Sequence, residues 1–360
     1  MKKNIKILIT SPSINTDENV SGIANLTRLL IEKNKIIDYE LFVVGKKDKE
    51  PRDLAWLVKQ PLVLFAFIRK ILNTEISLIH INIPLQKYST IINSLLALIC
   101  KLFNKPYLIH IRGGLYSNNN CIPNLHKFLF NNSLKYARSI ITLGNEETIF
   151  INEFYRIPHS KIYTLPNSVQ IPDIDVLKNK NNNLLQLLYM GRIDKDKGLT
   201  EIIQALKHFS IGNLFNLNIA GDGPDKVWFL NNLSIENINF TYHGVVNGND
   251  KSKLLSIAHI FLLPSYYEGL PNSLLEAMSY GVIPIVTPVG SISEVVKDKF
   301  NGYLVPVKSS VDIVKALTLI NNNVIVSNSM SLNAFNSIQK NYCLNNYIIR
   351  LNEIYMNLCQ

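Results

Sequence analysis

Two acidic residues, Glu268 and Glu276, stand eight positions apart and are separated by a tight turn at residues 269–272. The turn precedes a helical pattern, and the backbone N–H groups at a helix N-terminus bind anions. A carboxylate repels phosphate, so we expect the two side chains to accept hydrogen bonds from sugar hydroxyls instead. A diphosphate flanked by two sugars is a nucleotide sugar, which is the ligand that this pattern predicts.

Within the turn, the N–H groups of Gly269, Leu270 and Asn272 are candidates for contacts with sugar or phosphate. Pro271 has no N–H to donate. A structural alternative exists for Glu276, because the segment from Ser273 to Glu276 has the spacing of a capping box, in which the Glu side chain bonds back to the N-cap residue. Both interpretations of Glu276 stay open here.

Two basic residues, Arg192 and Lys197, lie in a loop that follows an expected strand. When a diphosphate departs, negative charge grows on the leaving oxygen, and fixed cations stabilise it. Arg can contact two phosphate oxygens, whereas Lys supplies a compact point charge. The alternative is a solvated basic loop, since Asp194 and Asp196 stand beside them.

Gly22 follows the first expected strand and precedes a helix. Without a side chain, its backbone can approach a phosphate closely, although an ordinary turn glycine is the alternative. The G-x-G-x-x-G fingerprint is absent, which argues against a dehydrogenase.

The elements that would position these residues form an α/β pattern. Short apolar runs alternate with helical patterns, which indicates parallel strands in doubly wound sheets, and 360 residues suffice for two domains. A polar stretch near residues 171–183 marks a linker. The strands are expected at residues 5–10, 40–44, 78–83, 107–111, 139–143, 184–189, 217–220, 239–242, 260–263 and 282–286.

Composition limits the classes of partner. The chain is 47% hydrophobic and 18% charged, which is globular, and its formal net charge of +10 favours an anionic partner. No nucleic-acid recognition motif appears, so we expect no nucleic acid. Residues 61–72 and 94–103 are apolar with basic residues near their ends. They could lie on an anionic membrane surface or pack on a sheet, and both alternatives stay open.

Localisation follows from what the sequence lacks. We find no secretory signal and no apolar run of about 20 residues. The four cysteines have no metal-site spacing and are expected to be reduced, in a cytoplasmic protein that can associate with the inner face of the cell membrane. Two D-x-D pairs occur, Asp173 with Asp175 and Asp194 with Asp196. We expect neither to bind metal.

These residues lie in a sequence that resembles the group-1 (family 4) retaining glycosyltransferases of the GT-B fold, which build bacterial cell-surface polysaccharides. The resemblance covers nearly the whole chain, and its second half is the more specific. The matching segments are VSGIA at 20–24, KPYLIHIRGG at 105–114, LPNSV at 165–169, LYMGRIDKDKG at 188–198, IAGDGP at 219–224, PSYYEGLPNSLLEAMSYGVIPI at 264–285 and NGYLVP at 301–306.

The resemblance implies a fold of two Rossmann-like domains facing across a cleft. We expect an acceptor-side domain at residues 1–168, a linker at 169–183 and a nucleotide-sugar domain at 184–340. The helix at 341–360 should return to the first domain.

The resemblance also implies roles for the site residues. Arg192 and Lys197 would contact the diphosphate, Glu268 the transferred sugar and Glu276 the ribose. The loop at Gly22 would face the diphosphate, although this chain has Ser-Gly where relatives commonly have two glycines. The donor would be UDP- or GDP-linked, with no metal or other cofactor.

The implied reaction retains the configuration of the anomeric carbon. The acceptor would be a saccharide or a polyprenyl-diphosphate-linked glycan in O-antigen, capsule or lipopolysaccharide synthesis. Its oxygen would attack from the face that the diphosphate leaves, and the diphosphate would accept the proton.

Arg112 stands where many relatives carry a histidine. Arg cannot act as a general base, so we expect Arg112 to bind a phosphate of the donor or of a lipid-diphosphate acceptor. His110 is the alternative catalytic residue at this strand end, unless it is an ordinary strand histidine.

Two other functions stay open. One is a nucleotide-sugar epimerase of the same fold, for which we locate no acid–base pair. The other is a nonenzymatic nucleotide-sugar-binding protein.

Overall fold

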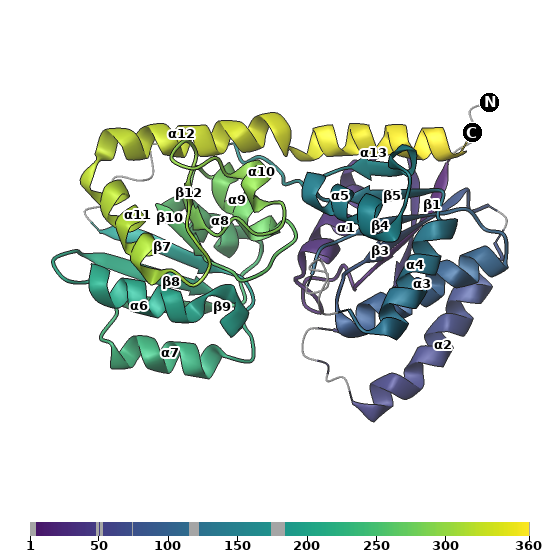
Figure 1. Ribbon diagram of the computed structural model, residues 1–360, viewed down its shortest axis with the longest axis horizontal. Helices are drawn as coiled ribbons and strands as arrows, with labels where there is room; N and C mark the ends of the chain where they lie inside the picture. The colour runs from purple at the N-terminus through teal and green to yellow at the C-terminus, as the bar shows by residue number, and fades with distance from the viewer. Residues whose placement is uncertain are drawn as a thin grey trace. The chain divides into compact units, whose positions relative to one another are not determined.

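The chain forms two compact units, one comprising Met1–Asn167 with Asn345–Gln360 and the other Ser168–Leu344. Each contains a six-stranded parallel sheet with helices (Figure 1), so the predicted α/β class with two doubly wound domains is confirmed. Most of the expected linker, residues 174–183, lies outside the described residues. The computed structural model describes residues 5–47, 50, 53–73, 75–114, 122–173 and 184–359.

The first unit has the strand order β2-β1-β3-β4-β5-β6. All residues of β3 and β4 are buried, as expected for parallel strands covered on both faces. The chain order reverses between β1 and β3, which creates a topological switch point. The elements are β1 (Lys6–Ser11), α1 (Gly22–Lys33), β2 (Asp38–Val43), α2 (Leu54–Ile71), β3 (Leu78–Ile83), α3 (Lys87–Leu102), β4 (Tyr107–Ile111), α4 (Asn124–Tyr136), β5 (Ser139–Thr142), α5 (Asn145–Tyr155), η3 (His159–Lys161) and β6 (Ile162–Thr164).

The C-terminal helix α13 (Leu344–Cys359) packs on the first unit through polar contacts. The hydroxyl of Tyr355 lies 2.6 Å from Nδ1 of His80 in β3. Asn352 and Asn34 exchange side-chain hydrogen bonds of 2.8 and 3.2 Å. These contacts join the last residues of the chain to the first sheet.

The second unit has the strand order β12-β11-β10-β7-β8-β9, and its switch point lies between β7 and β10. The elements are β7 (Leu185–Met190), η4 (Lys195–Lys197), α6 (Leu199–Phe209), β8 (Phe215–Ala220), α7 (Lys226–Ile235), β9 (Phe240–Gly244), α8 (Gly248–Ile257), β10 (Ile260–Leu263), α9 (Asn272–Ser279), β11 (Ile283–Val286), α10 (Ile292–Val295), β12 (Tyr303–Leu304), α11 (Ser310–Asn322) and α12 (Val324–Asn341).

The two apolar segments with basic ends differ in the structure. Residues 94–103 lie mostly in α3, whose Leu96, Ala97 and Cys100 are fully buried, so this segment packs within the unit. Residues 61–72 lie mostly in α2, part of which is exposed. Among the described helices, none combines the length and the hydrophobicity that crossing a bilayer requires.

Candidate functional site

The carboxyl ends of β7 and β10 bring together three of the residues that the sequence singled out, Arg192, Lys197 and Glu268. The two strands are neighbours at the switch point of the second sheet. Arg192 and Lys197 follow β7, whereas Glu268 follows β10. Because ligands of such sheets bind outside the carboxyl ends at the switch point, this edge is the expected site.

Lys197 and Glu268 form a direct ion pair. The distance from Nζ to Oε1 is 2.7 Å, and the side chains are only 19% and 14% exposed. The hydroxyl of the buried Ser265 donates to the same oxygen at 2.9 Å. Among the described residues, none donates a hydrogen bond to Oε2, so this oxygen can accept one from a ligand hydroxyl.

The loops on either side of this pair are in direct contact. Gly198 has φ +74°, and a Cβ there would lie 2.2 Å from the carbonyl oxygen of Pro264, so only glycine fits. The Tyr267 hydroxyl donates to Oδ2 of Asp196 at 2.9 Å. Burial, followed by this bond to Asp196, raises the pKa of Tyr267, which therefore remains a donor. These contacts fix Lys197 and Glu268 relative to each other.

Asp194 and Asp196 both accept hydrogen bonds, Asp196 from Tyr267 in the loop after β10. Asp194 caps η4 by accepting from the backbone N–H of Asp196. Of the other D-x-D pair, Asp173 is described, whereas Asp175 lies outside the described residues. In the part of the chain that is described, no three His, Cys, Asp or Glu side chains gather as a metal site would require.

Glu276 lies in α9 and is paired with a lysine. The Nζ atom of Lys251, in α8, lies 2.7 Å from Oε1 of Glu276, and both side chains are largely buried. The capping-box interpretation is wrong, because α9 begins at Asn272 with Pro271 at the N-cap, so that Ser273 is already inside the helix. The Glu276 carboxylate is thus held by a cation from a neighbouring helix.

The turn before α9 is supported by the loop that follows β11. Gly290 has φ +55°, and a Cβ there would lie 2.3 Å from the carbonyl oxygen of Glu268 and 2.6 Å from that of Gly269. The backbone N–H of Ser291 donates to the Gly269 oxygen at 2.9 Å. Leu270 is buried, whereas Gly269 and Asn272 are partly exposed at the start of the helix.

Arg192 lies at the rim of this site. Its side chain is 66% exposed, and its Nε lies 3.7 Å from Oδ2 of Asp194. Its backbone oxygen accepts a hydrogen bond of 2.5 Å from the buried Tyr189. The backbone of Arg192 is therefore fixed while its guanidinium faces solvent.

In the first unit, Arg112 follows β4 and is oriented by two amides. Its Nε donates to Oδ1 of Asn82 at 2.7 Å, and its Nη1 donates to Oδ1 of Asn167 at 2.9 Å. Asn82 is buried in β3, so the guanidinium is held at the carboxyl end of the sheet. Gly22 begins α1, after β1 of the same sheet, and Ser21 caps that helix.

His110 is fully buried and lies 3.2 Å from His80. Burial, followed by the nearby Arg112 charge, lowers the pKa of both rings, which are therefore neutral near pH 7. A ring with no exposed surface cannot reach a substrate. The geometry therefore favours the strand-histidine interpretation of His110.

Several residues that support the site were not predicted from the sequence. Ser265 could have been found, since a hydroxyl three positions before Glu268 is within reach of its side chain. Lys251 could not have been found, because it is one of several lysines on a polar helix. Gly290 could not have been found either, because its role depends on a close approach to another part of the backbone.

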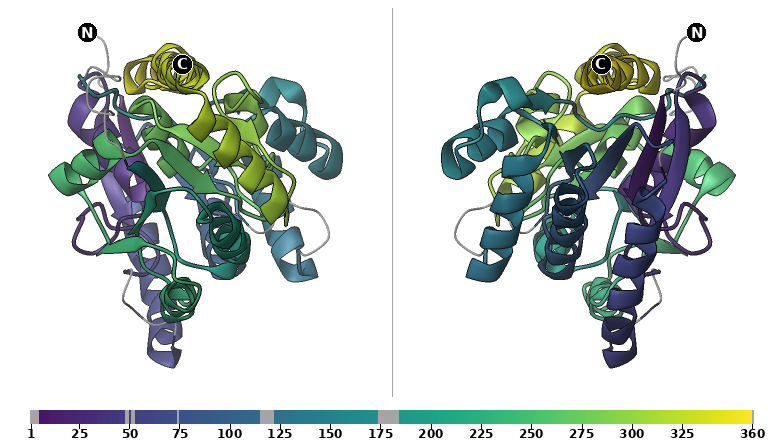
Figure 2. Two further views of the ribbon diagram at one scale, coloured as in Figure 1. Left: turned by 90° about the vertical axis from the view of Figure 1, so that its left-hand side faces the viewer. Right: turned by 90° about the vertical axis from the view of Figure 1, so that its right-hand side faces the viewer.

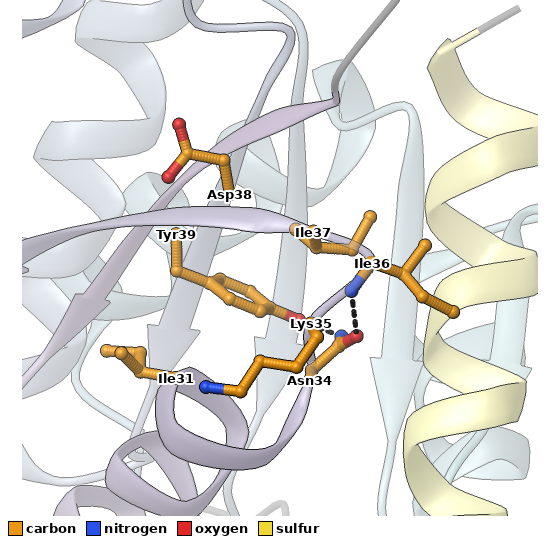
Figure 3. Close-up of a pocket in the computed structure, with 7 residues that line it drawn as sticks. All are labelled: Ile31, Asn34, Lys35, Ile36, Ile37, Asp38 and Tyr39. Atoms are coloured by element: carbon orange, nitrogen blue, oxygen red, sulfur yellow. Dashed lines mark hydrogen bonds between the residues drawn. The ribbon is translucent and has the colours of Figure 1, made fainter. Parts of the chain in front are cut away.

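A small pocket outside this site lies at the turn between α1 and β2. The Asn34 side chain within it bonds to Tyr39 and to the N–H of Ile36 (Figure 3). None of the predicted site residues lines it, and the amide holds the turn together. The lining residues are Ile31, Asn34, Lys35, Ile36, Ile37, Asp38 and Tyr39.

Comparison with known proteins gives a family match over part of the chain and a fold for nearly all of it. Residues 171–337 match the family model described as glycosyl transferases group 1. The chain is 26% identical over 253 residues to the UDP-Gal:alpha-D-GlcNAc-diphosphoundecaprenol alpha-1,3-galactosyltransferase of Escherichia coli, a match that covers 65% of this chain and 64% of that relative. The matches between this chain and two further relatives cover about half of the length of each relative.

Two solved structures resemble the chain over nearly its whole length. Sucrose-phosphate synthase of Thermosynechococcus elongatus superposes with a TM-score of 0.82 at 17% identity, covering 99% of both chains. Anabaena HepE, solved with UDP-glucose, superposes with a TM-score of 0.75 at 13% identity, covering 98% of this chain and all of the other. At these identities the likeness shows the fold, and the predicted GT-B class is confirmed.

Proposed function

We propose that this chain, whose residues 171–337 match the model of the group-1 glycosyl transferases, moves a sugar from a nucleoside diphosphate to a saccharide or lipid-linked acceptor. The observation that carries the proposal is the contact between Lys197 and Glu268. It places a cation suited to a diphosphate beside a carboxylate suited to sugar hydroxyls, at the edge of the sheet where ligands bind.

Arg192 and Lys197 hold the diphosphate in this proposal. Glu268 accepts hydrogen bonds from the transferred sugar through its open Oε2, and Glu276 accepts from the ribose. The backbone at Gly269, Leu270 and Asn272 lies at the start of α9, where partial positive charge favours an anion.

The donor is proposed to be a UDP-sugar and the acceptor a polyprenyl-diphosphate glycan, with no metal required. The names of the E. coli relative and of the HepE complex, which refer to UDP-Gal and UDP-glucose, support this choice. In the first unit, Gly22 and Arg112 are the proposed contacts for phosphate groups.

The proposed reaction proceeds with retention. The acceptor oxygen forms a bond to the anomeric carbon on the face from which the diphosphate leaves, while the bond from that carbon to the diphosphate oxygen breaks. The departing diphosphate takes the acceptor proton, and Arg192 and Lys197 stabilise its charge. The anomeric configuration of the product, determined by NMR, tests this mechanism.

The location proposed is the cytoplasm, at the inner face of the cell membrane. The net charge of +10 and a lipid-linked acceptor support it.

Glu268→Gln tests the activity. The amide preserves shape but loses the charge, so turnover should fall at least about tenfold, or roughly 1.4 kcal/mol of barrier, without loss of folding by circular dichroism. Glu236→Gln is the matched control, because Glu236 pairs with Lys207 elsewhere in the second unit. Near-normal turnover of Glu268→Gln would remove Glu268 from the site.

A further inference from the structure

Helix α2 (Leu54–Ile71) is apolar on two opposite sides, and the protein covers only one of them. The covered side carries Trp56, Phe67 and Ile71, which are buried. Phe67 packs edge-on against Phe42 of β2, with ring centroids 5.0 Å apart. One side of the helix therefore already contributes to the core of the first unit.

The other side exposes a continuous apolar stripe. Leu54, Val58, Leu62 and Phe65 are spaced four, four and three residues apart, which places them on one helical face, and each is 67–79% exposed. We call these four residues the α2 stripe. Figures 1 and 2 show α2 at the periphery of its unit, with its N-terminal end projecting past α3. Contiguous exposed apolar surface of this kind marks a protein or membrane contact.

Unpaired positive charge lies beside the stripe. The helix contains no acidic residue, and Lys59 and Arg69 are exposed. Within the described part of the chain, neither forms an ion pair, in contrast to Lys70, which is paired with Glu40. An apolar face bordered by unpaired cations is complementary to a partner that has an apolar interior and anionic groups at its surface.

We infer that the α2 stripe docks on an anionic lipid bilayer, with its apolar side chains at the boundary between headgroups and acyl chains and with Lys59 and Arg69 against lipid phosphates. The inference rests on the proposed membrane location and names the surface responsible. The helix is roughly 27 Å long at 1.5 Å per residue, and its buried face belongs to the protein core, so it lies along the membrane.

A second copy of the chain fits this surface less well. A two-fold symmetric contact brings the same patch of both copies together. Lys59 and Arg69 of one copy would then approach the same cations of the other, with no acidic residue on the helix to compensate. Charge therefore favours lipid over self-association.

Flotation with vesicles tests the surface. The wild-type protein should bind vesicles containing phosphatidylglycerol at low salt and should bind pure phosphatidylcholine weakly. Leu62→Asp with Phe65→Asp should weaken binding at least tenfold, and Lys59→Gln with Arg69→Gln should remove most of its salt dependence. The matched control is Ile211→Asp with Leu214→Asp, two apolar residues of the second unit that are 78% and 80% exposed, which should bind like wild type.

Three results would overturn the inference. The first is that the wild-type protein does not bind anionic vesicles, and the second is that the Leu62→Asp, Phe65→Asp variant binds them as tightly as the wild type does. The third is that the wild type sediments as a dimer and this variant sediments as a monomer. Titration of each variant with UDP-sugar, without vesicles, separates the two proposals. If the wild-type protein binds UDP-sugar but does not bind vesicles, only the membrane surface is refuted. If the wild-type protein does not bind UDP-sugar, the proposed function is refuted.

Discussion

The ammonium nitrogen of Lys197 lies 2.7 Å from Oε1 of Glu268, although the two residues are 71 positions apart in the chain. They follow neighbouring strands that the sheet brings together at its switch point. Each charge is thus compensated before any ligand binds. In the proposed complex a diphosphate would therefore share Lys197 with Glu268, and the open Oε2 of Glu268 would accept from a sugar hydroxyl.

Removing one partner of this pair should destabilise the protein. Lys197→Met leaves a largely buried carboxylate without its cation, which costs roughly 1–3 kcal/mol of unfolding free energy. Adding Glu268→Gln should recover part of that loss, because the remaining charge is then also gone. Urea unfolding of the two single variants and the double variant measures the coupling. Simple addition of the two single effects would show that the pair does not interact in solution.

Arg192→Ala should weaken nucleotide diphosphate binding at least about tenfold, equivalent to roughly 1.4 kcal/mol, while leaving stability unchanged. The side chain is 66% exposed, so its loss removes little packing. Calorimetric titration with UDP measures the affinity. Lys207→Ala, an exposed cation of the same unit, is the control and should bind UDP normally. If Arg192→Ala also binds UDP normally, Arg192 does not contact the diphosphate.

Gly290→Ala should displace the loop that carries Glu268, because residue 290 packs against the backbone of that loop. The new Cβ would lie 2.3 Å from the Glu268 carbonyl oxygen, which forces the backbone to move. UDP-sugar affinity should fall together with thermal stability. Gly212→Ala is the matched control, because Gly212 also has a positive φ, +81°, but its Cβ would meet nothing within 4 Å. That variant should lose only about 1 kcal/mol of stability and no affinity. Equal effects of the two variants would contradict the support assigned to Gly290.

Stability should fall at acid pH through His80 and His110. Burial, and then Arg112, lowers the pKa of both rings, so the unfolded chain binds their protons first as the pH drops below about 6.5. Their stabilising contribution is present above that pH and is lost below it, at up to roughly 1.4 kcal/mol per pH unit for each ring. A variant with both residues changed to Asn should show a shallower decline between pH 7.5 and 5.5 in urea unfolding. Identical slopes for variant and wild type would show that the rings titrate normally.

The strands that were predicted correctly were recognised from runs of apolar residues along the sequence. Buried parallel strands are apolar along their length, and β3, β4 and β10 appear at the expected residues. The strands β6 and β12 were missed because three and two residues are too few to form a pattern.

The site was only partly predictable. Its residues lie in short motifs that can be recognised along the chain, but the contacts among them depend on the tertiary fold. The sequence singled out Glu268 by its spacing from Glu276 and Lys197 by its place in a basic loop after a strand, yet the pairing of the two depends on the strand order. The partner of Glu276 depends on how α8 packs beside α9, which no sequence spacing records. The capping-box interpretation failed because the N-cap is Pro271, two positions before Ser273.

The proposed function depends on the binding of a nucleotide sugar by the second unit, through Lys197, Arg192 and the two glutamates. A thermal-shift panel with UDP-, GDP-, ADP- and CMP-sugars, with chelator present, tests it most directly. A ligand at 100 times its Kd stabilises by about 2.7 kcal/mol, which is readily measured. We predict stabilisation by a UDP-sugar that Arg192→Ala reduces. If no nucleotide sugar stabilises the protein, the proposed function is contradicted.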